Sequence, residues 1–202
     1  MLDYSSGGGF APLRRALAQH LRISRGVEVQ AERILITSGT QQSLALCASV
    51  LADAGDTIWM EDPAYWGATK VMQAAQLHIQ AVATDVLGMN PHTKQKLKPP
   101  RLIYLTPSHQ YPTGAVMGLE RRQTLLDCAQ QHQAWILEDD YDSEYRFSGA
   151  PLSSLQGMDT QQRVIYMGTF SKTLYPGLKF GYLVAPPALA QALQMAHHDL
   201  NR

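Results

Sequence analysis

Short apolar runs rich in β-branched residues alternate along the chain with longer segments whose apolar residues recur at helical spacing. Each short run is typical of a buried strand, and each longer segment is typical of an amphipathic helix. The predicted strands are 33–37, 57–61, 77–82, 101–106, 134–138, 163–167 and 180–184. The predicted helices run from Pro12 to Gly26, from 42 to 51, from Pro63 towards Ala75, over 119–132, and onward from Pro187.

Strands that alternate with helices require crossover connections, which build a mainly parallel sheet with helices on both faces. The sequence therefore predicts an α/β fold with three layers, α/β/α, around a seven-stranded and mainly parallel sheet. Neither of the last two connections between strands holds a long helical pattern, so we expect the last strand to be antiparallel. Residues 85–100 are polar with several Pro and Gly, and they are predicted to form a loop with at most one helical turn.

Composition narrows the possible functions. The 202 residues carry 17 Lys+Arg and 17 Asp+Glu, which argues against a nucleic-acid binder that works alone. Charged residues make up 17% of the chain, below the roughly 25% of a typical soluble domain, which indicates an oligomer surface or a piece of a larger protein. Cys47 and Cys128 stand singly, so neither a disulfide framework nor a cysteine metal site is expected. Without a long apolar run or a signal pattern, we expect no membrane contact and a cytoplasmic location.

In open α/β sheets, ligands collect at the carboxyl ends of the strands, so the residues that follow each predicted strand are the candidates for chemistry. A small polar turn, 38–42, opens a helix after the first strand and is a candidate anion site, although such a turn is more often only a helix cap. Tyr65 and Trp66 follow the second strand as candidates for stacking on a planar ligand, or as core residues. The loop 106–114 after the fourth strand is either a ligand loop or a turn held by its two prolines.

Charged residues follow the next two strands. Glu138, Asp139, Asp140 and Asp142 would repel one another at a buried strand end unless a metal or a protonated ring nitrogen lies nearby, the alternative being a solvated acidic loop. Because the strand is strongly apolar, Asp139 is expected near the core. Lys172 follows the sixth strand and is either a surface lysine or an amine that forms a Schiff base.

Taken together, these segments resemble the large domain of fold type I pyridoxal phosphate (PLP) enzymes, the aspartate-aminotransferase type. The matching motifs are SGTQQ (38–42), EDPAYW (61–66), PTG (112–114), ILEDDYD (136–142) and GTFSKTLYPGLKFGY (168–182). SHQYPTG, EDDYDSEYRF and the last motif resemble more closely the MocR subfamily of GntR-type transcriptional regulators. In that subfamily an aminotransferase-like domain is fused behind a winged helix-turn-helix.

The resemblance implies a role for each matching residue. Lys172 would form the Schiff base with PLP, Asp139 would pair with the pyridine nitrogen, and Tyr141 would hydrogen-bond the ring's phenolic oxygen. The remaining cofactor contacts are implied for the stacking ring Tyr65, for the backbone N–H groups of Gly39, Thr40 and Gln41, and for the hydroxyls of Thr169 and Ser171. No metal is implied.

Two of the matching positions depart from the family pattern. Lys179 stands where the family usually has an arginine on the phosphate, so cofactor affinity is expected to be lower. Tyr111 stands where aminotransferases usually have the Asn of NPTG, and this favours the regulator subfamily.

The resemblance leaves two functions open. Residues 1–202 are expected to be the PLP-binding large domain of a regulator that senses an amino acid or amine, or the large domain of a true aminotransferase. We expect a homodimer, with DNA contacted only through a winged helix outside these residues. The family's small domain, which carries the arginine for the substrate carboxylate, is also expected to lie outside them, so this chain alone should not transaminate efficiently.

Overall fold

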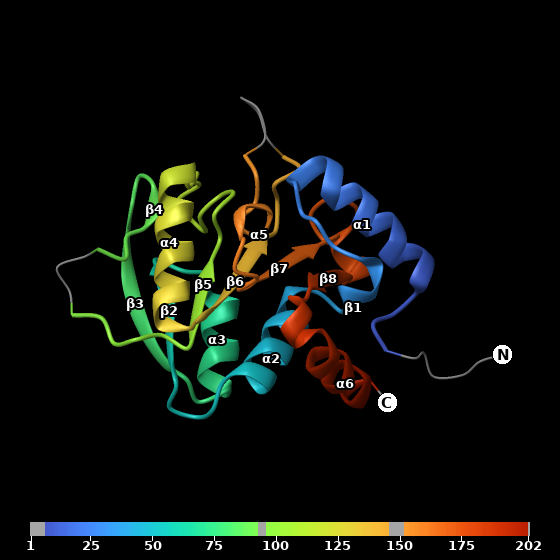
Figure 1. Cartoon of the computed structure of the whole chain (residues 1–202), viewed down its shortest axis with the longest axis horizontal. Coiled ribbons are helices and arrows are strands. Elements are labelled where there is room, and N and C mark those ends of the chain that lie inside the picture. Colours follow the sequence, from blue (N-terminus) through green and yellow to red (C-terminus); the bar gives the residue numbers. More distant parts are fainter. Residues whose placement is uncertain (1–6, 93–95, 146–151, 202) are drawn as a thin grey trace.

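The computed structural model describes residues 7–92, 96–145 and 152–201, which form one mixed sheet between two sets of helices (Figure 1). Arg146 and Phe147 of the quoted EDDYDSEYRF motif lie outside the described residues. The strands are β1 (Ile34–Thr37), β2 (Thr57–Asp62), β3 (His78–Asp85), β4 (Gly88–Met89), β5 (Leu102–Leu105), β6 (Trp135–Asp140), β7 (Val164–Thr169) and β8 (Gly181–Val184).

Strand order in the sheet is β1-β8-β7-β6-β5-β2-β3-β4. The pairs from β7 through β6, β5 and β2 to β3 are all parallel. β8 is antiparallel to both β1 and β7, which confirms the direction predicted for the last strand. Since two antiparallel pairs separate β1 from β7, β1 points the same way as the parallel strands, and its carboxyl end reaches the same edge of the sheet.

The prediction of seven strands was wrong by one. β4 lies inside the predicted loop 85–100 and pairs antiparallel with the end of β3, Thr84 opposite Met89 and Asp85 opposite Gly88. A strand of two residues carries no periodicity that a sequence pattern can reveal. The same pairing extends β3 to Asp85, beyond its predicted end at residue 82.

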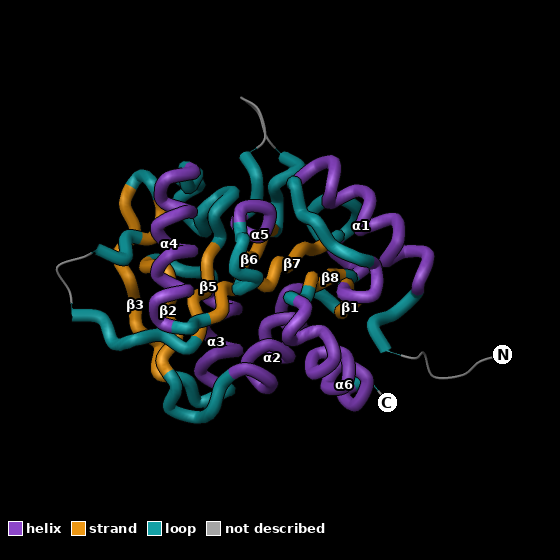
Figure 2. Tube along the Cα trace, in the orientation of Figure 1, coloured by secondary structure: helices purple, strands orange, loops and turns teal. Residues whose placement is uncertain are grey.

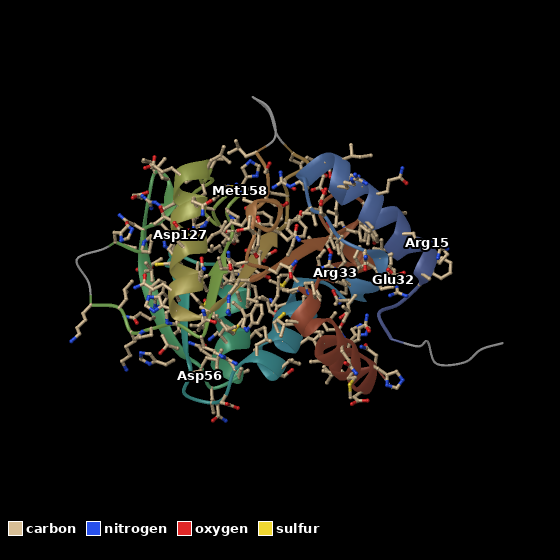
Figure 3. All side chains as sticks on the ribbon, viewed as in Figure 1. Arg15, Glu32, Arg33, Asp56, Asp127 and Met158 are labelled. Carbon is tan, nitrogen blue, oxygen red and sulfur yellow. The ribbon has the colours of Figure 1, made fainter. Side chains whose placement is uncertain are left out.

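Helices cover both faces of the sheet, which confirms the three-layer prediction (Figures 1 and 2). One side carries α1 (Ala11–Arg25), α4 (Leu119–His132) and α5 (Leu155–Met158), and the other carries α2 (Thr40–Leu51), α3 (Trp66–Ala74) and α6 (Ala190–Leu200). Side chains fill both interfaces (Figure 3). No helix among the described residues is long and apolar enough to cross a membrane.

Alternation along each strand sorts its side chains between the two layers. In β6, Leu137 packs in the cluster with α2 and α3, while Ile136 packs in the cluster with α4. Because both faces are covered, the central strands are apolar at nearly every position, as the sequence pattern suggested. A polar residue at the end of such a strand is therefore committed to one layer or the other by its place in the alternation.

The ends of two helices show how local sequence sets the geometry. α1 has Pro12 in its first turn and ends at Gly26, whose φ of 67° suits a residue without a Cβ. α3 begins at Trp66, three residues later than the predicted start at Pro63. The carbonyls of Asp62 and Pro63 accept hydrogen bonds from the side chains of Thr84 and Gln110, and the N-cap residue Tyr65 still has an extended backbone.

Candidate functional site

A cavity of about 730 Å³ lies where the carboxyl ends of the parallel strands meet the N-terminal end of α2. All the residues at which the resemblance places cofactor contacts line this one cavity: Gly39, Thr40, Gln41, Tyr65, Tyr111, Asp139, Tyr141, Thr169, Ser171, Lys172 and Lys179. Ser38, Trp66, Tyr104 and Thr106 complete the lining. The residues come from widely separated segments, and the parallel direction of the strands brings them together.

One end of the cavity is formed by the first turn of α2. Gly39 is the N-cap residue, with φ of 110° and ψ of 177°, and it has no side chain to cap the helix. The first N–H groups of a helix have no partner within the helix, so they are available to an anion, and the helix dipole favours negative charge there. Nothing lies within 4 Å of the place where a Cβ of Gly39 would be, so the turn faces open space.

Three tyrosine rings line one wall of the cavity. The ring of Tyr111 stands edge-on to both others, with its centroid 5.4 Å from that of Tyr65 and 6.3 Å from that of Tyr141. Gln41 Nε2 donates a hydrogen bond of 3.2 Å to the hydroxyl of Tyr65 and so links this wall to the first turn of α2. Planar apolar rings with polar tips suit a flat ligand that also carries polar groups.

The acidic run at the end of β6 is divided between the two faces of the sheet. Glu138 and Asp140 point away from the cavity and have cationic partners: Arg122 lies 3.8 Å from Glu138, and Arg25 Nε donates to Asp140 over 2.7 Å. Glu138 also accepts from the N–H groups of Leu155 and Gln156. Three of the four carboxylates are thereby paired within the chain, because Asp142 lies 2.8 Å from the ring nitrogen Nδ1 of His109.

Asp139 is the exception, and it is the carboxylate that lines the cavity. Its Oδ2 accepts a hydrogen bond of 2.8 Å from the hydroxyl of Tyr104, while its buried Oδ1 has no hydrogen-bond partner among the described residues. Burial raises the pKa of Asp139 to about 7, the Tyr104 hydroxyl lowers it, and the nearby carboxylates Asp140, Asp142 and Glu61 raise it further. The site therefore holds a buried carboxyl group without a cation.

The segment that follows β7 supplies the positively charged side chains of the cavity lining. Lys172 and Lys179 both line the cavity and are exposed, and they are the only Lys or Arg among its described lining residues. The turn before Lys172 is held by the Ser171 N–H, which donates to Thr169 Oγ1, and the backbone carbonyl of Lys172 accepts a 2.6 Å hydrogen bond from the Tyr145 hydroxyl. The cavity thus combines two amines, a helix N-terminus that faces open space, and one buried carboxyl group without an ion pair among the described residues.

Sequence reasoning missed Tyr104 and Glu61. Tyr104 lies in β5 beside β6, opposite Leu137, so its hydroxyl reaches Asp139 two residues further along. Glu61 is buried at the end of β2 and accepts from the N–H and the hydroxyl of Thr106, and burial raises its pKa to about 7. Both residues were visible as polar groups in apolar strands, but their partners depend on strand order and register.

Comparison with known sequences gives two kinds of relative. The chain is 45% identical over 186 residues to the probable rhizopine catabolism regulatory protein MocR of Rhizobium meliloti, an alignment that covers 92% of this chain and 38% of the relative. It is 35% identical over 208 residues to aromatic-amino-acid aminotransferase 1 of Thermococcus litoralis, covering 99% of this chain and 50% of that enzyme. The chain therefore spans about half or less of the length of these relatives.

Solved structures agree with these sequences. LysN, an α-aminoadipate aminotransferase from Thermus thermophilus complexed with N-(5'-phosphopyridoxyl)-L-leucine, superposes with a TM-score of 0.89 at 34% identity, covering 99% of this chain and 51% of that one. The family model described as "Aminotransferase class I and II" matches residues 2–201. The resemblance drawn from the motifs is confirmed: this chain belongs to the class I and II aminotransferase family.

Proposed function

We propose that this chain is the PLP-binding, effector-sensing domain of a GntR/MocR-type transcriptional regulator. The observation that carries the proposal is the 45% identity to a MocR regulatory protein over 92% of the chain. Tyr111 supports it, because this position departs from the aminotransferase pattern and its ring occupies the centre of the tyrosine wall. Either proposed function would be carried out in the cytoplasm.

PLP is the cofactor of the family, and the residues of the cavity fit it. The buried Oδ1 of Asp139 lacks a partner among the described residues, and a protonated pyridine nitrogen is a donor with the charge that this carboxyl needs. By its pairing, Asp139 would keep that nitrogen protonated. The pKa of Asp139, raised to about 7, should fall when the cation binds.

The other residues of the cavity lining would contact the remaining parts of the cofactor. Lys172 would hold the cofactor covalently through its amine, and Tyr65 would stack on the ring while Tyr141 donates to its phenolic oxygen. The phosphate would lie on the N–H groups of Gly39, Thr40 and Gln41, joined by the hydroxyls of Thr169 and Ser171 and by the charge of Lys179.

When bound, PLP supplies an electron sink for chemistry at the carbon that bears the amino group of a ligand. The protein's part is to bind and orient. Lys172 is the amine that an incoming amino acid or amine would displace, so the class of effector follows from the site. The tyrosine wall would cover one side of the ring and shield it from water.

The alternative is the large domain of a true aminotransferase, which the 35% identity to the Thermococcus enzyme favours. None of the described residues lining the cavity is an arginine, so none offers a guanidinium fork to a substrate carboxylate. We therefore propose that these 202 residues alone bind PLP and an amine but do not turn over efficiently. Measurable turnover of amino acids with 2-oxo acids by this chain would contradict that proposal.

A homodimer is part of the same proposal. Trp66 lines the cavity, and Leu174 and Tyr175 follow the cavity residue Lys172 by two and three residues; all three large apolar side chains are about two-thirds accessible. Such a group typically marks an interaction surface. Light scattering should give twice the chain mass, and a monomer at micromolar concentration would contradict it. DNA would be contacted by a winged helix outside these residues.

PLP titration of the chain, followed by visible absorbance, tests the proposed function. We expect the wild-type chain to develop a yellow band, and we expect sodium borohydride to bleach that band while it fixes the cofactor covalently to the protein. Lys172→Ala should lose the band, and Lys70→Ala, which removes an exposed lysine from α3, should keep it. A band that survives in Lys172→Ala, or no band in the wild type, would contradict the proposal.

A further inference from the structure

Arg25 is a charged residue that the cofactor site does not use, yet it is 7% exposed and its side chain donates hydrogen bonds to three different residues. Nε donates to Asp140 Oδ2 over 2.7 Å, Nη2 donates to Ser108 Oγ over 2.6 Å, and Nη1 donates to the carbonyl of Leu152 over 3.3 Å. A planar guanidinium presents several donors in fixed directions, so these bonds fix the relative positions of the groups that accept them.

The two side chains that Arg25 joins belong to the two strand ends that carry most of the ring-binding residues. Asp140 is the residue between Asp139 and Tyr141 at the end of β6. Ser108 lies in the loop after β5, three residues before Tyr111. Arg25 reaches both from the face of the sheet opposite the cavity, across sequence separations of 115 and 83 residues.

Both ends of Arg25 are themselves held. Arg25 is the last residue of α1, and the next residue, Gly26, is the C-cap in the left-handed conformation with φ of 67°. Its backbone carbonyl accepts from the N–H and from the hydroxyl of Ser154, each over 3.2 Å. Asp140 has a second donor in the hydroxyl of the buried Tyr166. The network is therefore a fixed support rather than a surface ion pair.

We propose that Arg25 is a positioning residue for the ring-binding half of the cavity: by tying Asp140 to Ser108 from behind, it holds Asp139, Tyr141 and Tyr111 in their orientations. This inference rests on the proposed function. Alternate residues of a strand point to opposite faces, so fixing Asp140 on one face aims Asp139 at the other. Asp140 is also the last residue of β6, so fixing it anchors the chain from which Tyr141 follows into the cavity lining. The guanidinium also forms an ion pair with Asp140, whose negative charge contributes to the raised pKa of Asp139.

The phosphate-binding turn at Gly39 has no contact with this network among those described, and that difference makes the proposal testable. Arg25→Lys keeps a charge for Asp140, but a single ammonium does not reproduce the fork that joins Asp140 to Ser108. Arg22→Lys is the matched control, because Arg22 lies on the same helix three residues earlier and is exposed. Ser108→Ala removes only one of the bonds and serves as a milder variant.

The measurement is the dissociation constant of each chain for PLP and for pyridoxal, which lacks the phosphate. Loss of a group that orients a binding side chain costs about 10- to 100-fold in affinity at metal sites, and we expect about tenfold here for Arg25→Lys with both ligands. The ratio of the two constants reports the contribution of the phosphate and should stay at the wild-type value. Arg22→Lys should match the wild type throughout.

Two results would overturn the inference. One is an Arg25→Lys chain that binds both ligands as tightly as the Arg22→Lys chain does. The other is a ratio of the dissociation constant for pyridoxal to that for PLP that falls below the wild-type value, which would indicate that the whole site has loosened. Should the wild type bind neither ligand, the proposed function fails, and amide hydrogen exchange of the cofactor-free chains decides the inference alone. Arg25→Lys should then speed exchange at residues 108–111 and 139–142 together, and unchanged protection would refute it.

Discussion

Asp139 and Asp140 are neighbours in the sequence, are equally buried, and are built into opposite environments. In each carboxyl group Oδ1 is buried without a partner among the described residues, and the difference lies at Oδ2: that of Asp140 accepts from the Arg25 guanidinium and the Tyr166 hydroxyl, whereas that of Asp139 accepts only from the Tyr104 hydroxyl. Asp140 therefore forms an ion pair, and Asp139 forms none with the described residues. The alternation of a β-strand makes this separation possible, since consecutive side chains enter different layers. One face of the strand end stabilises the fold, while the other holds a carboxyl group that we propose to be reserved for a cofactor.

The largest effect on stability should come from breaking the ion pair between Arg25 and Asp140, on the face of the sheet opposite the cavity. Asp140→Leu leaves the Arg25 guanidinium buried without its carboxylate, and removal of one partner of a buried pair typically costs about 3–5 kcal/mol of unfolding free energy. Urea unfolding measures the loss. Asp142→Asn is the control, because the pair with His109 is partly exposed and is expected to contribute less than about 1 kcal/mol. Equal losses in the two variants would contradict the distinction between the faces.

Replacement of Asp139, on the cavity face, should instead increase the unfolding free energy at high pH. Burial raises the pKa of Asp139 to about 7, above its unfolded value, so the stability that its protonated form contributes is complete below about pH 4 and is lost as pH rises through 7. Asp139→Asn removes this titration. At pH 8 it should add about 2–4 kcal/mol to the unfolding free energy, because each unit of raised pKa is worth about 1.4 kcal/mol.

Urea unfolding of both chains at pH 4 and at pH 8 measures that difference. Glu61, whose pKa is also raised to about 7 by burial, titrates in both chains, so the part of its contribution that comes from burial cancels in the comparison. The gain should disappear at pH 4. An Asp139→Asn chain that is less stable than the wild type at pH 8 would show that Asp139 is a structural residue.

A smaller effect is expected from the hydroxyl that holds Asp139. Tyr104→Phe removes the hydrogen bond to Oδ2, so the pKa of Asp139 should rise above 7, with a loss of about 1 kcal/mol in unfolding free energy at pH 8. A titration of the ¹³C carboxyl resonance reports this pKa. Tyr166→Phe makes the same change at Asp140 on the far face and should leave the resonance of Asp139 at its wild-type midpoint. If both substitutions shift it equally, the two carboxyls are not independent.

A further small effect concerns the turn at Gly39, which we propose to bind an anion. Gly39→Ala places a Cβ in open space but on a backbone with φ of 110°, so we expect a loss of about 1 kcal/mol from strain alone. Gly118→Ala has equally open surroundings at a φ of −70° and should cost nothing by this mechanism. Thermal unfolding compares the two, and equal melting temperatures would show that the turn at Gly39 relaxes.

Much of the fold follows from the sequence because each strand is apolar and each helix is periodic. The parallel strands from β2 to β7 lie within a few residues of their predicted positions, and the antiparallel last strand follows from the short connections before it. β4 escaped prediction because the two residues Gly88 and Met89 pair only through the end of β3. The late start of α3 depends on hydrogen bonds from Thr84 and Gln110, which are distant in sequence.

The candidate site was predictable to the extent that it consists of strand ends. The parallel order brings Lys172, Asp139 and the turn at Gly39 to one cavity, although their chemical roles stay predictions. Tyr104 and Arg25 could not be assigned from sequence, because their contacts with Asp139 and Asp140 need the register of β5 on β6 and the placement of α1. The residues proposed to bind the cofactor follow the ends of strands and can be read from the sequence, whereas the residues that hold them in place come from distant segments of the chain.

The most direct test of the central claim is the ¹³C carboxyl titration of Asp139 in the free chain and in the chain with PLP. The account predicts a midpoint near pH 7 without cofactor, because burial raises the pKa, and a carboxylate that stays ionised well below pH 7 with PLP, because the pyridinium nitrogen pairs with it. An unchanged midpoint after PLP has bound would contradict the claim that this unpaired carboxyl exists for the cofactor ring.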